Sequence, residues 1–180
     1  MTPAVPGRLA SPARTTDRFR TMMSAFPSGV AVITAVDESG DPHGMTCTSL
    51  CSVSVTPPTL LVCLDERSGT LGALAAGGLF AVNLLHARGR TAAELFAGPV
   101  PDRFSRIGWE PSPLHGIPAL TGHAHTVAEC RVARSVPAAD HTIVVGEVRN
   151  VLELPEAADP LMYGRRSYGR WTDAGGVTAL

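Results

Sequence analysis

The sequence predicts a mainly β domain with short helices, built as an antiparallel barrel. Two stretches in the C-terminal half, 124–132 and 142–154, alternate their side chains with the period of two that strands show. Earlier apolar stretches are separated by turn-forming residues, such as the run 37–41 and the pair Pro57–Pro58. The chain has no repeated strand–helix–strand series, so we expect strands joined by hairpins, with a few helices packed outside.

The N-terminal part divides into a tail and a helix. Residues 1–15 are rich in proline and have no hydrophobic period, so we expect a disordered tail. Between 17 and 26 apolar residues recur at helical spacing, which predicts a short amphipathic helix capped by Thr15 or Thr16. The apolar positions of this helix are Phe19, Met22, Met23 and Phe26.

Further strands and helices alternate along the rest of the chain. The predicted strands are 30–36, 43–55 (a strand or an extended loop), 59–65 as a central strand, and 79–85. The predicted helices are 68–77, capped by Ser68 and ended by Gly77–Gly78, then 91–96 and 101–107. Residues 109–118 are expected to form an irregular rim or lid, and 173–180 a flexible C-terminal tail, which leaves 16–172 as one domain.

Composition excludes several classes of function. The 180 residues carry a formal net charge of −1, and the 15 basic residues, all arginine, are scattered, so no nucleic-acid partner is expected. No apolar stretch approaches the roughly 20 residues that span a bilayer, and no signal-peptide core is present, so we expect no membrane partner and a cytoplasmic location. The four cysteines lack metal-binding spacing, so no metal is expected.

A hydroxyl-rich segment is the strongest candidate for chemistry. The sequence lacks the glycine-rich nucleotide motifs, the P-loop and the G-x-S-x-G elbow. It does carry hydroxyls at positions 46, 48, 49, 52 and 54 beside an apolar strand, with Arg67–Thr70 at a helix start. Such donors suit a phosphate or a heterocycle. The alternative is that these hydroxyls only satisfy turns and strand edges.

Several motifs in order resemble one family. They are Phe26–Thr34, Gly44–Thr46 through Val55 and Pro57–Pro58, Phe80–Leu85, Asp102–Phe104 with Trp109, Ala128–Cys130, Asp140–Ile143 through Gly146–Val148, and Pro160–Leu161 with Tyr163 and Tyr168. From about Phe19 to Trp171 the chain is similar to the short-chain flavin reductases, the reductase components of two-component flavin-dependent monooxygenases. The resemblance implies an FMN-binding split β-barrel, antiparallel and Greek-key-like.

The resemblance also implies an activity and its partners. The protein would transfer hydride from NADH or NADPH to FMN or FAD and release the reduced flavin to a separate oxygenase or halogenase. A homodimer is implied as well. Residues matching the family's flavin and nicotinamide contacts are Pro27, Ser28 and Val30; Thr46, Cys47, Thr48 and Ser49; Ser52, Val53 and Ser54; Arg67, Ser68 and Thr70; Asn83, Arg88, Arg90 and Phe104; and Asp140, His141 and Tyr168.

Within this set, His141 is the candidate catalytic residue, because the family associates this histidine with the nicotinamide side. Its alternative role is that of a strand histidine bonded to a neighbour. Ala139 stands where the family has glycine, so a positive φ there would strain the turn. This departure favours the second hypothesis, a non-catalytic flavin carrier or sensor on the same barrel.

Overall fold

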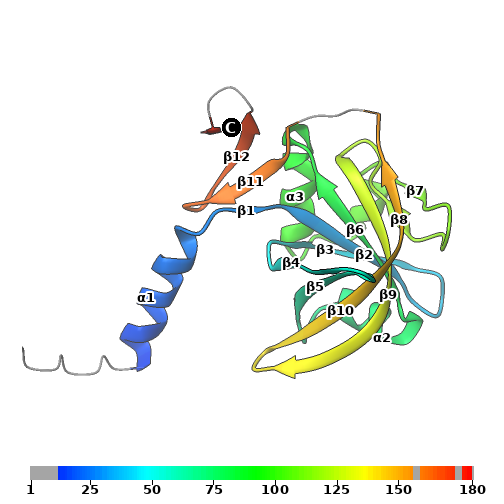
Figure 1. The fold of residues 1–180 in the computed structure, drawn as a ribbon, viewed down its shortest axis with the longest axis horizontal. Coiled ribbons are helices and arrows are strands. Elements are labelled where there is room, and N and C mark those ends of the chain that lie inside the picture. Colours follow the sequence, from blue (N-terminus) through cyan, green and yellow to red (C-terminus); the bar gives the residue numbers. More distant parts are fainter. Residues whose placement is uncertain (1–11, 156–158, 173–175, 180) are drawn as a thin grey trace, which may run out of the picture.

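The computed structural model describes residues 12–155, 159–172 and 176–179. It is mainly β, with antiparallel sheets and a few short helices, as predicted (Figure 1). The elements in chain order are α1 (Pro12–Ser24), β1 (Ser28–Gly29), β2 (Ala31–Val36), β3 (Pro42–Cys47), β4 (Leu50–Val55), β5 (Pro58–Asp65), α2 (Gly69–Gly77), β6 (Leu79–Leu85), the 3-10 turn η1 (Ala87–Gly89), α3 (Arg90–Ala97), η2 (Arg103–Ser105), β7 (Glu110–Pro111), β8 (Pro118–Ala119), β9 (Ala124–Ala138), β10 (His141–Glu153), β11 (Leu161–Gly164), β12 (Ser167–Thr172) and β13 (Gly176–Ala179).

The main sheet has seven strands in the order β3-β2-β6-β9-β10-β5-β4. Its two edge strands, β3 and β4, are consecutive in the chain and are joined only by Thr48 and Ser49. The sheet therefore curls until its edges meet at this connection, and β3 and β5 contact each other. A smaller sheet, β1-β11-β12-β13, extends from the barrel toward α1 (Figure 1).

Two hydrophobic cores stabilise the curled sheet. One lies on its inner face and contains Leu64, Phe80 and Val144, with Leu74 of α2 packed among them. The other core includes Phe96 of α3. The predicted caps of α2 are confirmed, because the amide of Thr70 donates to Ser68 Oγ and Gly78 ends the helix with a φ of 66°.

The outer face of β5 and β10 is less covered. Val62, Leu64 and Val144 point into the core, so the residues between them point outward. In the antiparallel register His141 lies opposite Asp65 and Ile143 lies opposite Cys63. These four residues therefore share the outer face.

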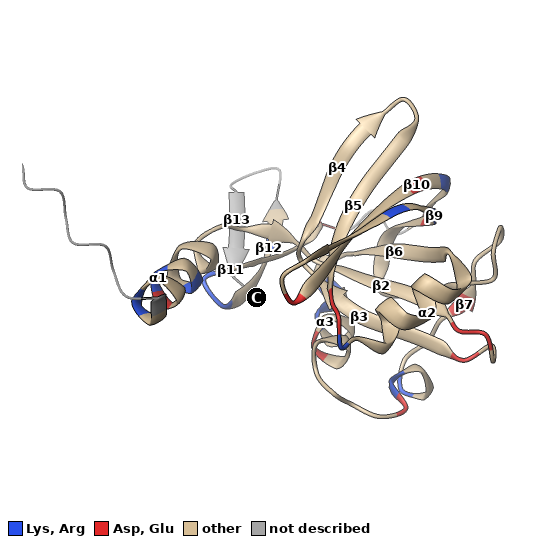
Figure 2. Cartoon of the chain, turned by 90° about the horizontal axis from the view of Figure 1, so that it is seen from below, with Lys and Arg blue, Asp and Glu red and all other residues tan. Residues whose placement is uncertain are grey.

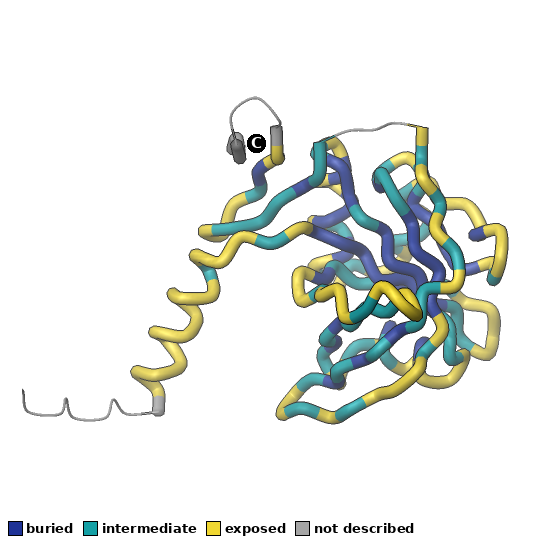
Figure 3. The backbone as a smooth tube through the Cα atoms, viewed as in Figure 1, coloured by how far each residue is buried: buried dark blue, intermediate teal, exposed yellow. Residues whose placement is uncertain are grey.

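Helix α1 projects from the barrel and leaves its apolar side uncovered. It begins at Pro12, so 12–15 belong to the helix rather than to the predicted tail; proline is tolerated in a first helical turn because its missing N–H needs no partner there. Its apolar residues are largely exposed (Figure 3), with Phe19 at 56% and Met22 at 60%.

Other predictions of local structure need correction. Residues 101–107 form only the 3-10 turn η2 instead of a helix. Gly176–Ala179 form β13, paired with β12, where a flexible tail was predicted. The rest of the two predicted tails, 1–11, 173–175 and 180, lies outside the described residues.

Candidate functional site

An open groove of about 640 Å³ lies where β3 turns into β4. Thr48 and Ser49 line it from the connection, Cys51 from β4 and Cys63 from β5. Ser49 Oγ donates a hydrogen bond to the carbonyl oxygen of Cys63 at 2.9 Å. Helix α1 contributes apolar side chains to the same groove, among them Phe19. The groove thus combines small polar groups with apolar walls.

A smaller, mainly apolar pocket of about 380 Å³ adjoins the groove. The two share Phe26, Ser28, Thr48 and Leu50. The structure therefore brings together five of the predicted flavin contacts. They are Pro27, Ser28, Val30, Thr48 and Ser49.

Two predicted residues next to this connection turn their side chains elsewhere. Thr46 Oγ1 donates to the carbonyl oxygen of Ala93 in α3, at 2.6 Å. Cys47 is buried in the inner core, and burial is the main cause that raises the pKa of its thiol. Both side chains therefore have structural partners in α3 and the barrel interior, and their contacts with a ligand stay predictions.

The predicted contacts of β4 also lie outside the groove. Ser52 and Val53 are exposed on the hairpin that β4 forms with β5, and Val53 stands at a register shift in the pairing. Ser54 Oγ accepts a hydrogen bond from the Thr56 amide. This bond agrees with the alternative prediction for Ser54, in which its hydroxyl satisfies a turn and does not bind a ligand.

Asn83 is wrong as a ligand contact. Its side chain is 0% exposed and lies on β6 inside the domain. Its amide nitrogen donates to the carbonyl oxygen of Val32 and to Thr34 Oγ1, and its Oδ1 accepts from the Leu120 amide. These bonds hold β2 and the chain before β9 against β6, so Asn83 is a structural residue.

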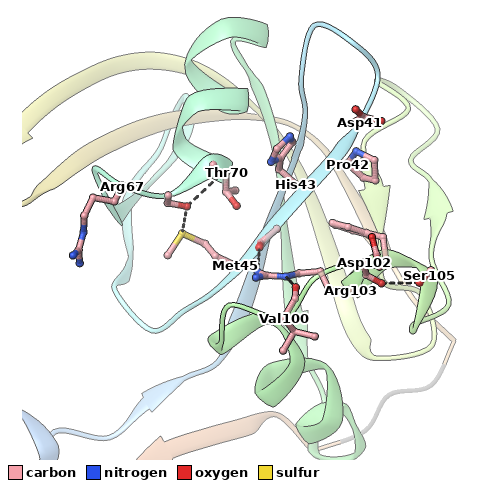
Figure 4. A pocket seen from close by; sticks show the side chains of 14 residues that line it. Asp41, Pro42, His43, Met45, Arg67, Thr70, Val100, Asp102, Arg103 and Ser105 are labelled. Atoms are coloured by element: carbon pink, nitrogen blue, oxygen red, sulfur yellow. Dashed lines mark hydrogen bonds between the residues drawn. The ribbon is translucent and has the colours of Figure 1, made fainter.

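Four predicted contacts line a separate cavity of about 720 Å³ between β3, the start of α2 and the segment 100–105 (Figure 4). They are Arg67, Ser68, Thr70 and Phe104. The Arg67 guanidinium forms two bonds to the Asp65 carboxylate, and these bonds hold the pKa of Asp65 far below its usual value.

Arg103 is fixed at one wall of this cavity. Its guanidinium donates to the carbonyl oxygens of Gly44, Gly98 and Val100, at 2.7–3.1 Å. Gly44 is required beside it, since a Cβ there would lie 2.8 Å from Phe96. The wall is therefore preformed.

The remaining predicted cations lie on η1 and α3. Arg88 is exposed, and Arg90 pairs with Glu94 at 2.8 Å and stacks over the ring of Tyr168, 5.5 Å from its centre. Burial is the main cause that raises the pKa of Tyr168. Tyr168 also packs on Tyr163, which lines the groove.

His141 and Asp140 lie at the tip of the β9–β10 hairpin. His141 Nδ1 lies 2.7 Å from Asp140 Oδ1, and this hydrogen bond is the main cause that lowers the pKa of Asp140. His141 shares the outer face with Cys63, its diagonal neighbour across the β5–β10 pair, at a separation of roughly 7–8 Å. Ala139 adopts a φ of 58°, so the condition for a strained turn is met.

The sequence reasoning missed some of the groove's residues. Tyr163 reaches it because β11 pairs with β1, opposite Ser28, and such a long-range pairing has no local signal. The alternation of side chains along β5 would predict Cys63 on the outer face, but only if the register of the strand were known. His125, which is not among the predicted contacts, lines the adjoining pocket from β9.

The arrangement suits binding of a planar heterocycle better than hydrolysis. The groove offers hydroxyls, thiols and apolar walls, with a histidine on the same outer face. In the described part of the chain, no three histidine, cysteine or acidic residues cluster as a metal site would require. No helix among these residues is long and apolar enough to cross a membrane. The fold and groove together are typical of β-barrel oxidoreductases that handle a ring cofactor.

Comparisons with known proteins identify the family. The family model for the flavin reductase like domain matches residues 23–172. The flavin reductase (NADPH) of Lentzea aerocolonigenes is 56% identical over 87% of this chain and 90% of its own, and the flavin reductase (NADH) of Kitasatospora aureofaciens is 47% identical over 86% and 81%. The chain belongs to the flavin reductase-like family, and it is an oxidoreductase.

Solved structures agree with this assignment. Nitrilotriacetate monooxygenase component B from Mycobacterium thermoresistibile has a TM-score of 0.85 at 33% identity, covering 94% of each chain. The NADH:FAD oxidoreductase of Streptomyces globisporus, solved with NAD and FAD fragments, has a TM-score of 0.83 at 31% identity, covering 94% of this chain and 99% of its own. The prediction of a flavin reductase that uses a flavin and a nicotinamide nucleotide is confirmed at the level of the family.

Proposed function

We propose that this protein transfers hydride from NADH or NADPH to FMN or FAD in the groove at the β3–β4 connection, and that it releases the reduced flavin to a separate oxygenase or halogenase. The observation that carries the proposal is the placement of Thr48, Ser49 and Cys63 around one groove, with His141 on the same outer face. The bound flavin supplies the hydride acceptor, N5.

The chain's own residues bind and orient the two rings. Thr48 and Ser49 carry exposed hydroxyls at the connection, and Ser49 is oriented by its bond to Cys63. Phe19 and Phe26 supply apolar surface against a ring face. This placement leaves the side toward His141 for the nicotinamide, where an imidazole oriented by Asp140 can hold the second ring in register.

The flavin phosphate has two candidate positions. The start of α2 offers Arg67, Ser68 and backbone amides beside the large cavity, and helix N-termini favour anions. Arg88 on η1 and Arg90 on α3 offer cations shortly after Leu85, which lines the smaller pocket. We favour the start of α2, because its cavity is the larger of the two and its polar groups come from several elements.

The surface left uncovered supports a homodimer. The apolar side of α1 is exposed, and β4 and β5 carry only one charged residue, Asp65 (Figure 2). Exposed apolar surface of this kind marks an interface. We propose that a second copy covers α1 and the β4–β5 hairpin, and that the protein works in the cytoplasm, where its four thiols stay reduced.

The decisive experiment is anaerobic oxidation of NADH and of NADPH, followed at 340 nm, with FMN, FAD or riboflavin added in turn. We expect rapid oxidation that depends on added flavin and a clear preference for one nicotinamide. Sedimentation of the same sample tests the dimer. Flavin binding without any oxidation of either nicotinamide would instead support the carrier.

A further inference from the structure

His125 presents an unused nitrogen to the apolar pocket beside the groove. It comes from β9 and lines that pocket together with Ser28 and Thr48. Its Nδ1 lies 2.9 Å from Thr126 Oγ1. Among the described residues its Nε2 has no hydrogen-bond partner and is not fully buried. The three side chains are the polar groups of an otherwise mainly apolar lining.

The surroundings keep this imidazole neutral. Burial lowers the pKa of His125, and the nearby His86 lowers it further. His86 is only 2% exposed, and the pKa of His123 beside it is lowered by the same two causes. The Nδ1 atoms of His86 and His123 are buried without partners, so neither nitrogen bonds His125.

The hydrogen bond to Thr126 is compatible with two tautomers of His125, and a threonine hydroxyl that donates to Nδ1 selects one of them. A threonine hydroxyl has one proton to donate, and Thr126 Oγ1 has His125 Nδ1 as its hydrogen-bonding partner among the described residues. When the hydroxyl donates to Nδ1, the imidazole proton resides on Nε2. His125 then offers an N–H donor to the pocket.

We propose that His125 is a ring-contacting residue that donates a hydrogen bond from Nε2 to a carbonyl oxygen on the pyrimidine edge of the bound flavin. The inference rests on the proposed function, since it places the flavin ring across the groove and the pocket that share Thr48. The opposite orientation would put the apolar dimethylbenzene end against His125 and leave a desolvated donor without a partner, which is unfavourable. Phe19 and Met23 line the groove but not the pocket, and they suit that apolar end.

A donor at this edge favours the reduced ring. Hydride transfer places negative charge at N1 and O2 of the flavin, so a hydrogen bond to that edge strengthens upon reduction. His125 therefore contributes more to binding of the reduced flavin than of the oxidised flavin. The reduction potential of bound flavin reports this difference independently of turnover.

The test compares the wild type with His125→Leu, His125→Gln and the control His115→Gln. We expect His125→Leu to weaken oxidised flavin about tenfold and reduced flavin about a hundredfold. The tenfold difference lowers the midpoint potential by about 30 mV for a two-electron couple. Glutamine keeps an N–H donor and should restore much of both losses. His115 lies on the loop 112–117 and lines neither pocket, so its variant should behave as the wild type.

Lumiflavin, riboflavin and FMN separate ring contacts from phosphate contacts. The loss in His125→Leu should be equal for all three, because the ring is common to them. A loss confined to FMN, or unchanged affinities and potential in a variant whose melting temperature equals that of the wild type, would overturn the role of His125 and leave the reductase proposal standing. Failure of the wild type to bind any of the three would overturn both.

Discussion

Ser49 Oγ donates to the carbonyl oxygen of Cys63, and this bond joins the connection between the two edge strands to β5 within the groove. The Ser49 hydroxyl oxygen is therefore held in one position before any ligand arrives, with its proton on Cys63 and its lone pairs free to accept a hydrogen bond. Preorganised polar groups lose little entropy on binding, so this corner is where the groove can hold a ring edge most effectively.

The first prediction concerns these hydroxyls. Thr48→Ala combined with Ser49→Ala should raise the Kd for FMN about tenfold, because a ring edge loses hydrogen bonds worth about 1 kcal/mol or more. Fluorescence titration of FMN measures the change. Ser39→Ala, in the turn between β2 and β3, is the matched control and should leave the Kd unchanged. Equal Kd values in all three proteins would show that the flavin binds elsewhere.

His141→Ala should lower kcat/KM for NADH or NADPH oxidation by one to two orders of magnitude and change flavin affinity less than threefold. The reason is that the proposed function places the nicotinamide on the side of His141 and the flavin contacts at the connection. Steady-state kinetics at saturating flavin measure this. Asp140→Asn weakens only the bond that orients the ring, so a smaller loss is expected. An unchanged kcat/KM in His141→Ala would contradict a role of His141 in holding the nicotinamide.

Flavin should protect one thiol from alkylation. Cys63 lines the groove, whereas Cys47 and Cys130 are buried and burial raises the pKa of Cys130 to about 12. In a Cys51→Ser background, iodoacetamide should therefore modify Cys63 first, and saturating FMN should slow that reaction at least fivefold. Peptide mass spectrometry over time measures the rate. Modification of Cys63 at one rate with and without FMN would contradict the placement of the flavin.

Ala139→Gly should stabilise the fold. A non-glycine residue at a φ of 58° pays roughly 1–2 kcal/mol, partly offset by the greater freedom of glycine in the unfolded chain. We expect the free energy of unfolding in urea to rise by up to about 1 kcal/mol. Ala138→Gly, in the last residue of β9, should lower it. A destabilised Ala139→Gly would mean that the turn adopts another conformation in solution.

Glu129→Gln should cost about 2–3 kcal/mol, because a buried carboxylate loses charge-assisted bonds. Burial alone would raise the pKa of Glu129, but hydrogen bonds from Asn150, Ser112 and the amides of His115 and Leu114 outweigh it and lower the pKa.

A lowered folded-state pKa gives stability that is present above the ordinary value of 4.5 and is lost as the pH falls through the folded-state value. The gap in unfolding free energy between wild type and Glu129→Gln should therefore narrow in acid. Glu147→Gln, at a partly exposed pair with Arg149, is the control. A difference in unfolding free energy between wild type and Glu129→Gln that grows as the pH falls would contradict a charged Glu129 carboxylate in the folded state.

The sequence predicted those features that depend on local rules. Turn residues and alternation located most strands, and Ser68 with Gly78 bounded α2, because capping is decided within a few residues. Which face of a strand points inward is decided elsewhere. β6 is apolar on both faces, so nothing in its sequence shows that Asn83 faces Thr34 rather than a ligand.

The same limit applies within the site. Thr46 and Thr48 look equivalent in the sequence. However, α3 packs over β3, and the Thr46 hydroxyl donates its hydrogen bond to the carbonyl oxygen of Ala93 in that helix. Tyr163 reaches the groove only through the pairing of β11 with β1. Both outcomes depend on contacts between segments far apart in the chain, which alternation and capping do not specify.

The connection Thr48–Ser49 links two strands that are the opposite edges of one ladder. A ligand seated on it restrains both edges together, although β3 and β4 exchange no hydrogen bonds within the sheet. Amide protons of these two strands should therefore slow their exchange with solvent in parallel when the groove fills, while those in the middle of β9 keep their rates. Binding of a ligand in the groove should therefore be measurable as reduced backbone fluctuation in β3 and β4, the two strands that the connection joins.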